Sequence, residues 1–146
     1  MEHELSRNYI ERATSLTAEC GLSGLLGMKL VSLKPGEIVS EMPLTENHMN
    51  YHRGAHGGAL FALADTTGGF AASSLGRSCT TVNSTIDYMR PVIGYDKVIC
   101  TAKTVKYGNT LAWVNCDITS EDGKLFCSAK FVYFLLDELS DSTTDI

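Results

Sequence analysis

The segment from Gly57 to Ser74 constrains the fold more than any other part of the sequence. Its eighteen residues are rich in alanine and glycine and carry a single charge, Asp65. The segment is long enough for about five helical turns. Because an exposed helix normally has a charged face, a helix with one charge is expected to be buried nearly all round. The sequence therefore predicts a long central helix that other elements enclose.

The segments on either side of this helix have the character of strands. Two strands are expected before it, at 27–34 and 37–43, joined by a type II turn with Pro35 and Gly36 at its centre. Turn signals divide the chain after the helix into four further strands, near 78–89, 97–106, 110–119 and 125–135. We also expect a helix that Ser6 caps and that ends near Gly21. This pattern predicts an α+β fold in which one antiparallel sheet packs on one long helix.

The length and charge of the chain limit its organisation and its partners. Its 146 residues suit a single domain, with a helical segment at 1–26 and an acidic tail at 136–146 that we expect to be mobile. The net charge of −5, without a basic run, argues against nucleic acid as a partner. The charged N-terminus and the lack of a long apolar stretch argue against membrane spanning and secretion. We therefore expect a cytoplasmic protein.

Cysteine and histidine spacing gives little support for a metal site. The five cysteines are odd in number and widely spaced, which predicts free thiols rather than a disulfide framework or a zinc site. His48, His52 and His56 recur at every fourth residue and would align as metal ligands on a helix. Asn47, Asn50 and Gly54 interrupt that stretch, so a loop is the better interpretation. We expect neither a metal nor a cofactor.

Asp65 is the strongest candidate for chemistry. A buried carboxylate is costly unless it is paired or hydrogen-bonded, and one that is retained is typical of a general base or a nucleophile. The alternative is a structural bond to a neighbouring turn or hydroxyl. The helix face that includes Asp65 is otherwise formed mostly by small residues, which allow a ligand or another backbone to approach: Gly58, Phe61, Ala62, Gly68, Gly69 and Ala72. The opposite stripe should lie on the sheet: Leu60, Leu63, Ala64, Thr67 and Ala71.

The start of the same helix offers a complementary group. The sequence His56-Gly57-Gly58 follows a polar loop, so the free amides there could form an oxyanion site, although the glycines could also serve backbone geometry alone. Gly57 and Asp65 are eight residues apart, or about 12 Å along a helix. Reacting groups must come within roughly 3–3.5 Å. The spacing therefore predicts an active site shared across a homodimer, with the small-residue face near the contact.

These residues together resemble a known family. The pattern of Asn50, His56-Gly57-Gly58 and Asp65, followed by Tyr88-Met89-Arg90-Pro91 and the turn at Gly108, is similar to that of hotdog-fold acyl-CoA thioesterases. The most similar branch is the PaaI type within the 4-hydroxybenzoyl-CoA thioesterase superfamily, and the resemblance covers roughly 27–134. It implies a hotdog fold, in which a curved antiparallel sheet wraps around the central helix. It also implies subunits that pair through their sheets and often form homotetramers.

The resemblance implies a role for each of these site residues. Asp65 would act as general base on water or as nucleophile on the thioester. The amide of Gly57 would polarise the thioester carbonyl, and Asn50 and His56 would shape the corner that binds its oxygen. A hydroxyl on the strand after the helix would place the water. Thr81 matches that position, with Asn83 and Ser84 close enough to compete.

Recognition of the thiol carrier and of the acyl group is less specific. The cations that could bind CoA phosphates are Arg90, Lys103 and Lys106, although ordinary surface charges explain the two lysines equally well. Aromatic and sulfur side chains could line an apolar pocket: Met49, Tyr51, Phe61 and Phe70. Neither set distinguishes CoA from acyl-carrier protein, or an aromatic acyl group from an aliphatic one.

The sequence thus predicts hydrolysis of an acyl-CoA-type thioester to a carboxylic acid and a free thiol. A hotdog hydratase or dehydratase is one alternative, but such enzymes in this fold pair an Asp with a His, whereas His56 and Asp65 are nine residues apart. A non-catalytic acyl-CoA-binding module is the other alternative, and the retained carboxylate on the helix argues against it.

Overall fold

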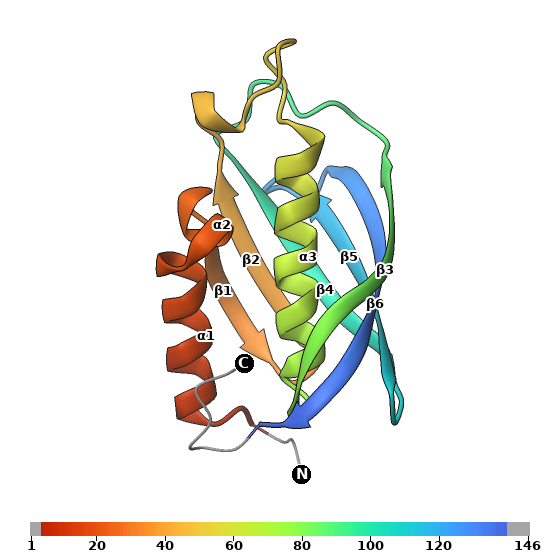
Figure 1. Cartoon of the computed structure of the whole chain (residues 1–146). Helices are drawn as coiled ribbons and strands as arrows, with labels where there is room; N and C mark the ends of the chain where they lie inside the picture. Colours follow the sequence, from red (N-terminus) through yellow and green to blue (C-terminus); the bar gives the residue numbers. More distant parts are fainter. Residues whose placement is uncertain (1–3, 140–146) are drawn as a thin grey trace.

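A curved antiparallel sheet wraps around the long helix α3 (Gly57–Ser73) in the computed structural model, which describes residues 4–139 (Figure 1). The six strands lie in the order β1-β2-β4-β5-β6-β3, so β1 and β3 form the two edges. The strands are β1 (Lys29–Lys34), β2 (Glu37–Pro43), β3 (Arg77–Tyr88), β4 (Lys97–Tyr107), β5 (Leu111–Thr119) and β6 (Leu125–Glu138). The expected α+β fold, with one antiparallel sheet on one long helix, is confirmed.

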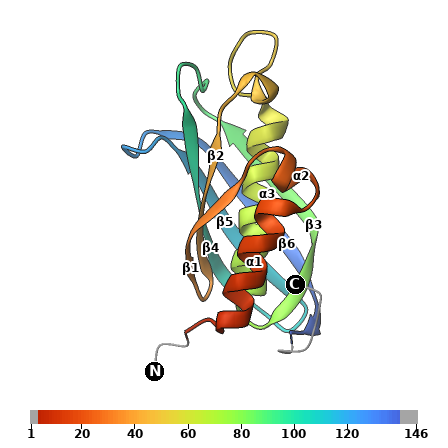
Figure 2. The ribbon, with the colours of Figure 1, turned by 90° about the vertical axis from the view of Figure 1, so that its left-hand side faces the viewer.

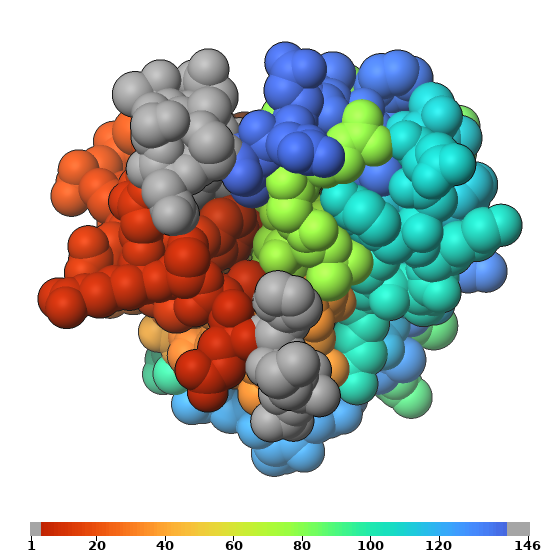
Figure 3. Space-filling view, turned by 90° about the horizontal axis from the view of Figure 1, so that it is seen from below, coloured from red at the N-terminus to blue at the C-terminus, as the bar shows by residue number. Residues whose placement is uncertain are grey.

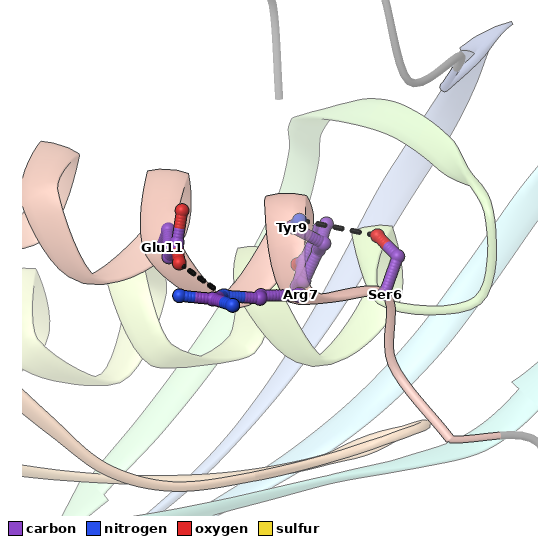
Figure 4. A network of polar contacts seen from close by, with 4 residues as sticks. All are labelled: Ser6, Arg7, Tyr9 and Glu11. Atoms are coloured by element: carbon purple, nitrogen blue, oxygen red, sulfur yellow. Dashed lines mark hydrogen bonds and ion pairs between the residues drawn. The ribbon is translucent and has the colours of Figure 1, made fainter.

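Helix α1 (Arg7–Glu19) begins where the sequence predicts. The side chain of Ser6 caps it by accepting a hydrogen bond from the backbone N–H of Tyr9 at 3.1 Å, and Arg7 pairs with Glu11 one turn on (Figure 4). The helix lies alongside α3 (Figure 2), where the Tyr9 hydroxyl donates to the carbonyl of Phe70 at 3.0 Å. A short helix, α2 (Gly21–Leu25), completes the N-terminal helical segment. Within residues 4–139, no helix is long and apolar enough to cross a bilayer.

The turns and the chain end follow the expected pattern with one exception. Gly36 has φ +74°, as position three of the predicted type II turn requires. Strand β6 runs to Glu138, however, so the expectation of a mobile tail from 136 onward is wrong for its first residues. The pairing of Arg77 with Glu138, and the hydrogen bonds of the Arg77 guanidinium to the carbonyls of Leu135 and Leu136, extend the sheet to this point. The remainder of that tail, residues 140–146, lies outside the described residues.

The core lies between α3 and the concave face of the sheet. All five members of the predicted sheet-facing stripe of α3 are buried. The predicted alternation in β5 is also confirmed, because its inward residues are buried: Ala112, Val114, Cys116 and Ile118. Three of the five thiols (Cys100, Cys116 and Cys127) are buried in this core, and all five are free.

A pair of buried hydroxyls connects α3 to β2. Thr67 Oγ1 donates to the carbonyl of Leu63 one turn earlier in the helix, at 2.6 Å, so its lone pairs remain to accept a hydrogen bond from Ser40 Oγ. Thr67 is fully buried and Ser40 is 2% exposed, so neither hydroxyl has access to water. The pair therefore fixes the helix against the sheet through groups that must satisfy each other.

One face of α3 differs from the expectation of burial all round. Nine of its seventeen residues are buried, but Asp65, Thr66, Gly69 and Phe70 are partly exposed. The sheet curves only part of the way around the helix, and this face lies open between α1 and β3 (Figure 1). Seen from below, the green surface where α3 ends and β3 begins is exposed between the red N-terminal helix and the teal end of the sheet (Figure 3). A single chain therefore leaves uncovered the face of α3 that carries Asp65, the one charged residue of the helix.

The small residues of α3 do not all lie on that open face. Gly68 and Ala72 are buried, and the nearest atoms to Gly68 come from Tyr133 and Cys116 of the sheet in the same chain. The expectation that Gly68 lies on a face open to a ligand or another backbone is therefore wrong, because the sheet of its own chain covers it. The physical reason is that the sheet approaches this side of the helix so closely that no side chain fits there.

The Ser40–Thr67 pair gives a test of the fold. Thr67→Val should lower the free energy of unfolding by about 1–3 kcal/mol, because it leaves the buried Ser40 hydroxyl without an acceptor. Urea denaturation measures the change. The double variant Ser40→Ala/Thr67→Val should recover most of the loss, since both polar groups are then absent. A double variant less stable than Thr67→Val would contradict this assignment.

Candidate active site

Asp65 lies midway along α3, where two hydroxyls reach its carboxylate. Thr81 of β3 donates to Oδ1 at 2.7 Å. The hydroxyl of Tyr133, on β6, donates to the main-chain carbonyl of Asp65 at 2.8 Å and lies 3.3 Å from Oδ1. Thr81 and Tyr133 face each other in the β3–β6 register, so neighbouring strands present both hydroxyls at one point of the helix.

The structure places Thr81, rather than its two competitors, at the carboxylate. The register between β3 and β6 shifts between Thr81 and Asn83, so the alternation of the strand is broken at Val82. Among the described residues, neither Asn83 nor Ser84 hydrogen-bonds to Asp65. Thr81 is the one hydroxyl of β3 that the fold brings to Asp65.

A hollow of about 270 Å³ opens beside this carboxylate. Its walls come from the open face of α3 and the start of β3: Asp65, Thr66, Gly69, Phe70, Ser73, Cys79, Thr80, Thr81 and Tyr133. Burial, reinforced by the charge of Asp65, raises the pKa of the Cys79 thiol to about 11. Burial likewise raises the pKa of Tyr133 above its usual range, again with the charge of Asp65 acting in the same direction. Both groups therefore keep their protons near neutral pH and face the carboxylate as neutral groups.

The start of α3 leaves one amide available. His56 caps the helix, and its Nδ1 accepts a hydrogen bond from the N–H of Gly58 at 2.8 Å. The amides of Ala59 and Leu60 donate to the carbonyl of His56. For the N–H of Gly57, the structure of residues 4–139 gives no acceptor. Gly57 therefore presents the open donor that the sequence predicts at this position.

The loop before α3 is irregular, as expected, and Asn50 organises it. The Asn50 Oδ1 accepts hydrogen bonds from the backbone of His52 at 2.9 Å and of Gly54 at 3.1 Å. Arg53, between them, has a φ of 63°, which a tight turn imposes. Because Oδ1 is used within the loop, any contact of Asn50 with a substrate must use its amide nitrogen.

The three histidines of the metal alternative are not aligned as ligands. His48 is buried, with Nδ1 accepting from the Thr45 amide at 3.1 Å and Nε2 donating to the Leu26 carbonyl at 2.7 Å. His52 packs on Tyr51, and His56 uses Nδ1 on its own helix. Across the described part of the chain, no group of three His, Cys, Asp or Glu side chains could hold a metal ion.

The amide of Gly57 lines a second hollow, of about 260 Å³. Its walls share no residue with the hollow at Asp65: Ala55, Gly57, Leu60, Tyr88, Met89, Arg90, Pro91 and Val92. Tyr88, at the end of β3, donates from its hydroxyl to the carbonyl of Gly57 at 2.8 Å. With about 12 Å of helix between the two groups, the hollows at Asp65 and at Gly57, here termed the two half-sites, do not meet within one chain.

The three candidate cations have different surroundings. Arg90 lines the hollow at Gly57, with Nη1 donating to the carbonyl of Leu125 at 2.8 Å. Lys103 pairs with Glu37 at 3.5 Å, and Lys106 lies over the ring of Trp113 at 5.2 Å. Both lysines project from the face of the sheet opposite α3, so one chain brings only Arg90 close to either half-site.

The four residues expected to line an apolar pocket are also dispersed. Phe70 lines the hollow at Asp65, whereas Phe61 packs on Phe131 of the sheet with ring centroids 5.4 Å apart. Met49 and Tyr51 line a hollow in the loop before α3, where Tyr51 is 91% exposed. One chain therefore does not form the expected pocket from these four side chains.

Two tyrosines of the site had no role assigned from the sequence. Tyr133 belongs to the inward, otherwise apolar row of β6, which suggests only a core residue. One signal was available, because a buried tyrosine needs a partner for its hydroxyl. Tyr88 is part of the family-like motif, but its contact with Gly57 depends on strand and helix ends that are 31 residues apart.

Comparison with known proteins identifies the family. Residues 52–127 match the model of the family described as "Thioesterase superfamily". The acyl-coenzyme A thioesterase PaaI of Escherichia coli is 32% identical over 99 residues, which cover 68% of this chain and 71% of that protein. The structure of the E. coli PaaI protein superposes with a TM-score of 0.84 at 26% identity, covering 92% of this chain and 98% of that chain. A hypothetical thioesterase of Streptococcus pneumoniae, solved with coenzyme A, has a TM-score of 0.74 at 29% identity and covers 77% of this chain and 91% of that chain.

These matches agree with the curved sheet and the central helix described above. They confirm the resemblance that the sequence predicts, both in fold and in the class of reaction. The chain belongs to the thioesterase superfamily and is a thioester hydrolase of the PaaI-type hotdog branch.

Proposed function

We propose that this thioester hydrolase cleaves acyl-CoA at an active site that two subunits share. Asp65 of one subunit would act together with the Gly57 amide of the other. The observation that carries the proposal is the separation of the two half-sites in one chain, which line different hollows about 12 Å apart along α3. The coenzyme A in the S. pneumoniae structure supports CoA as the carrier.

The chemistry needs only the groups present at the two half-sites. The Gly57 N–H and the positive end of the α3 dipole would stabilise the negative charge that develops on the carbonyl oxygen. In the general-base route, Asp65 takes a proton from water as the water oxygen attacks the carbonyl carbon. The C–S bond then breaks, and the proton passes to the departing thiolate to give a carboxylic acid and free CoA. Thr81 would hold the carboxylate, and the water, in place.

Strand β3 supports the way in which two chains would meet. It is an edge strand of twelve residues, and two of its apolar or aromatic side chains are exposed, Val82 at 53% and Tyr88 at 50%. An unpaired edge of this length favours pairing with another strand. Thr81 contacts Asp65 and Tyr88 contacts Gly57. In an antiparallel β3–β3 pair centred on Thr85, with Val82 as the extra residue of each strand, Thr81 of one chain lies opposite Tyr88 of the other, which brings the two half-sites together.

The homotetramer would need a second surface. The outer face of β6 offers one, because Phe134 is 40% exposed and Leu136 is 42% exposed on that face. We assign Arg90 to the CoA phosphates because, of the three candidate cations, it is the one that lines a hollow of the proposed site.

Asp65→Asn tests the role of the carboxylate. The variant should lower kcat by at least about 100-fold, because an amide cannot accept the proton or attack the thioester. The kcat of the variant and of the wild type is measured as thiol release from a panel of acyl-CoA and acyl-carrier-protein thioesters. Binding of CoA by the variant should be unchanged. Undiminished turnover would refute the role of Asp65, whereas tight binding without turnover by the wild type would favour a binding module.

Gly57→Pro tests the amide donor with little change to the helix. Proline is tolerated at the first helical position and lacks the N–H, and the extended backbone of His56 suits a residue before proline. The variant should lose about 10²–10³-fold in kcat. Gly57→Ala is the matched control, because its Cβ meets Tyr88 in the same way, at 3.3 Å, but its N–H remains. Equal loss in both variants would contradict a role for the amide.

Mixing the two inactive variants tests whether the site is shared. A dimer of one Gly57→Pro and one Asp65→Asn subunit has one intact site if the site is shared, and none if it lies within one chain. Random exchange at equal amounts should restore about one quarter of wild-type activity, since half of the dimers are mixed. Mass spectrometry confirms the exchange. An exchanged mixture without activity would count against the shared site.

A further inference from the structure

We propose that Tyr133 is a positioning residue for Asp65, and that Gly68 exists to let its hydroxyl reach α3. Tyr133 and Thr81 together would hold Oδ1 of the carboxylate, so that Oδ2 is the oxygen that takes part in the reaction. The inference rests on the proposed function, because it specifies how the carboxylate of that site is held.

The hydrogen bonds of Asp65 distinguish its two oxygens. Oδ1 accepts from Thr81 at 2.7 Å and has the Tyr133 hydroxyl 3.3 Å away. For Oδ2, the described residues supply no hydrogen bond. The carboxylate therefore has one oxygen fixed by neutral hydroxyls of the sheet and one oxygen free. A fixed geometry of this kind is what a general base or nucleophile needs.

The hydroxyl of Tyr133 also fixes the backbone that carries Asp65. It donates to the Asp65 carbonyl at 2.8 Å, in the interior of the helix, where that carbonyl is also part of the helical ladder. Tyr133 is 1% exposed, so its ring has no freedom to follow a moving helix. The single hydroxyl proton is shared between the Asp65 carbonyl at 2.8 Å and Oδ1 at 3.3 Å, so one side chain connects both the main chain and the carboxylate of Asp65 to β6.

Gly68 is the residue that makes this contact possible. A Cβ at Gly68 would lie 2.5 Å from the Tyr133 hydroxyl oxygen, 3.2 Å from Cys116 Sγ and 3.3 Å from Tyr133 Cζ. Real Cβ atoms do not approach an oxygen so closely, so any side chain at Gly68 would displace the tyrosine. A Cβ at Gly69 would lie 3.7 Å from the same ring, which is an ordinary contact. Of the two glycines, only Gly68 is required by Tyr133.

Tyr133→Phe tests the positioning role. The variant keeps the ring and should lower kcat about tenfold with KM nearly unchanged, because the hydroxyl proton shared between the Asp65 carbonyl and Oδ1 is lost and the carboxylate is held less firmly. The control is Tyr107→Phe, because the Tyr107 hydroxyl is buried without a hydrogen-bond partner among the described residues and the side chain lines neither hollow. That variant should keep wild-type kcat.

A double-mutant cycle separates positioning from a purely structural role. If Tyr133 acts through Asp65, Tyr133→Phe should have no further effect on the residual turnover of Asp65→Asn. Unchanged kcat in Tyr133→Phe, or an equal tenfold loss in the Asp65→Asn background, would overturn the inference. If Asp65→Asn is itself fully active, the proposed function fails first, so the two failures are distinguishable.

The role of Gly68 is tested by stability. Gly68→Ala should lower the Tm measurably, whereas Gly69→Ala should leave it unchanged or raise it, because alanine favours a helix over glycine. The double variant Gly68→Ala/Tyr133→Phe should regain part of the lost Tm, since the closest clashing atom is gone. A Gly68→Ala variant as stable as Gly69→Ala, or no recovery in the double variant, would contradict the assignment.

Discussion

A helix with one charge cannot remain exposed, and the rest of this structure follows from how α3 is covered. The sheet curves around it and buries nine of its seventeen residues, and α1 adds a contact through Tyr9. These elements cover the apolar side and leave the face of Asp65 open toward the edge strand β3 (Figure 1). The chain therefore buries the apolar side of α3 in its core, while the one carboxylate of the helix stays uncovered.

The two glycines that matter most on this helix serve different physical needs. At Gly57 the backbone must present a free N–H while the Tyr88 ring lies against it, with the Tyr88 hydroxyl on the Gly57 carbonyl. At Gly68 the backbone lies so close to β6 that the Tyr133 hydroxyl occupies the space that a Cβ would need. The first glycine leaves an N–H open at the start of the helix, and the second lets the helix interior contact the sheet. Both glycines allow a tyrosine of a neighbouring strand, Tyr88 of β3 or Tyr133 of β6, to hydrogen-bond to the main chain of α3.

Periodicity in the sequence was sufficient for most of the fold. The apolar stripe from Leu60 to Ala71 and the alternation of β5 both predict their buried faces correctly, because these patterns depend on local geometry. Thr81 was also found, through its spacing from Tyr88 in the family motif. Periodicity failed where long-range packing decides. It placed Gly68 on the open face of the helix, and it ended the last strand before residues that Arg77 holds in the sheet.

The site shows the same division between local and long-range information. The capping role of His56 and the turn at Asn50 are contacts over a few residues, and such positions are marked by residue type. The contact of Tyr133 with Asp65 joins residues 68 positions apart, and nothing in the alternation of β6 distinguishes this tyrosine from a core residue. Only the requirement for a hydroxyl partner, combined with a glycine opposite, could have indicated it.

Strand β3 links the architecture to the chemistry more closely than α3 does. It contacts Asp65 through Thr81 near its start and Gly57 through Tyr88 at its end, so both half-sites depend on one edge strand. Two such edges that pair antiparallel exchange these contacts between chains, and the register of the pair decides which groups meet. Side chains alternate along a strand, so a slip of one residue would turn Thr81 or Tyr88 of the partner to the wrong face. The register shift at Val82, next to Thr81, is therefore part of the geometry of the site, because it determines which side chains of β3 face the helix.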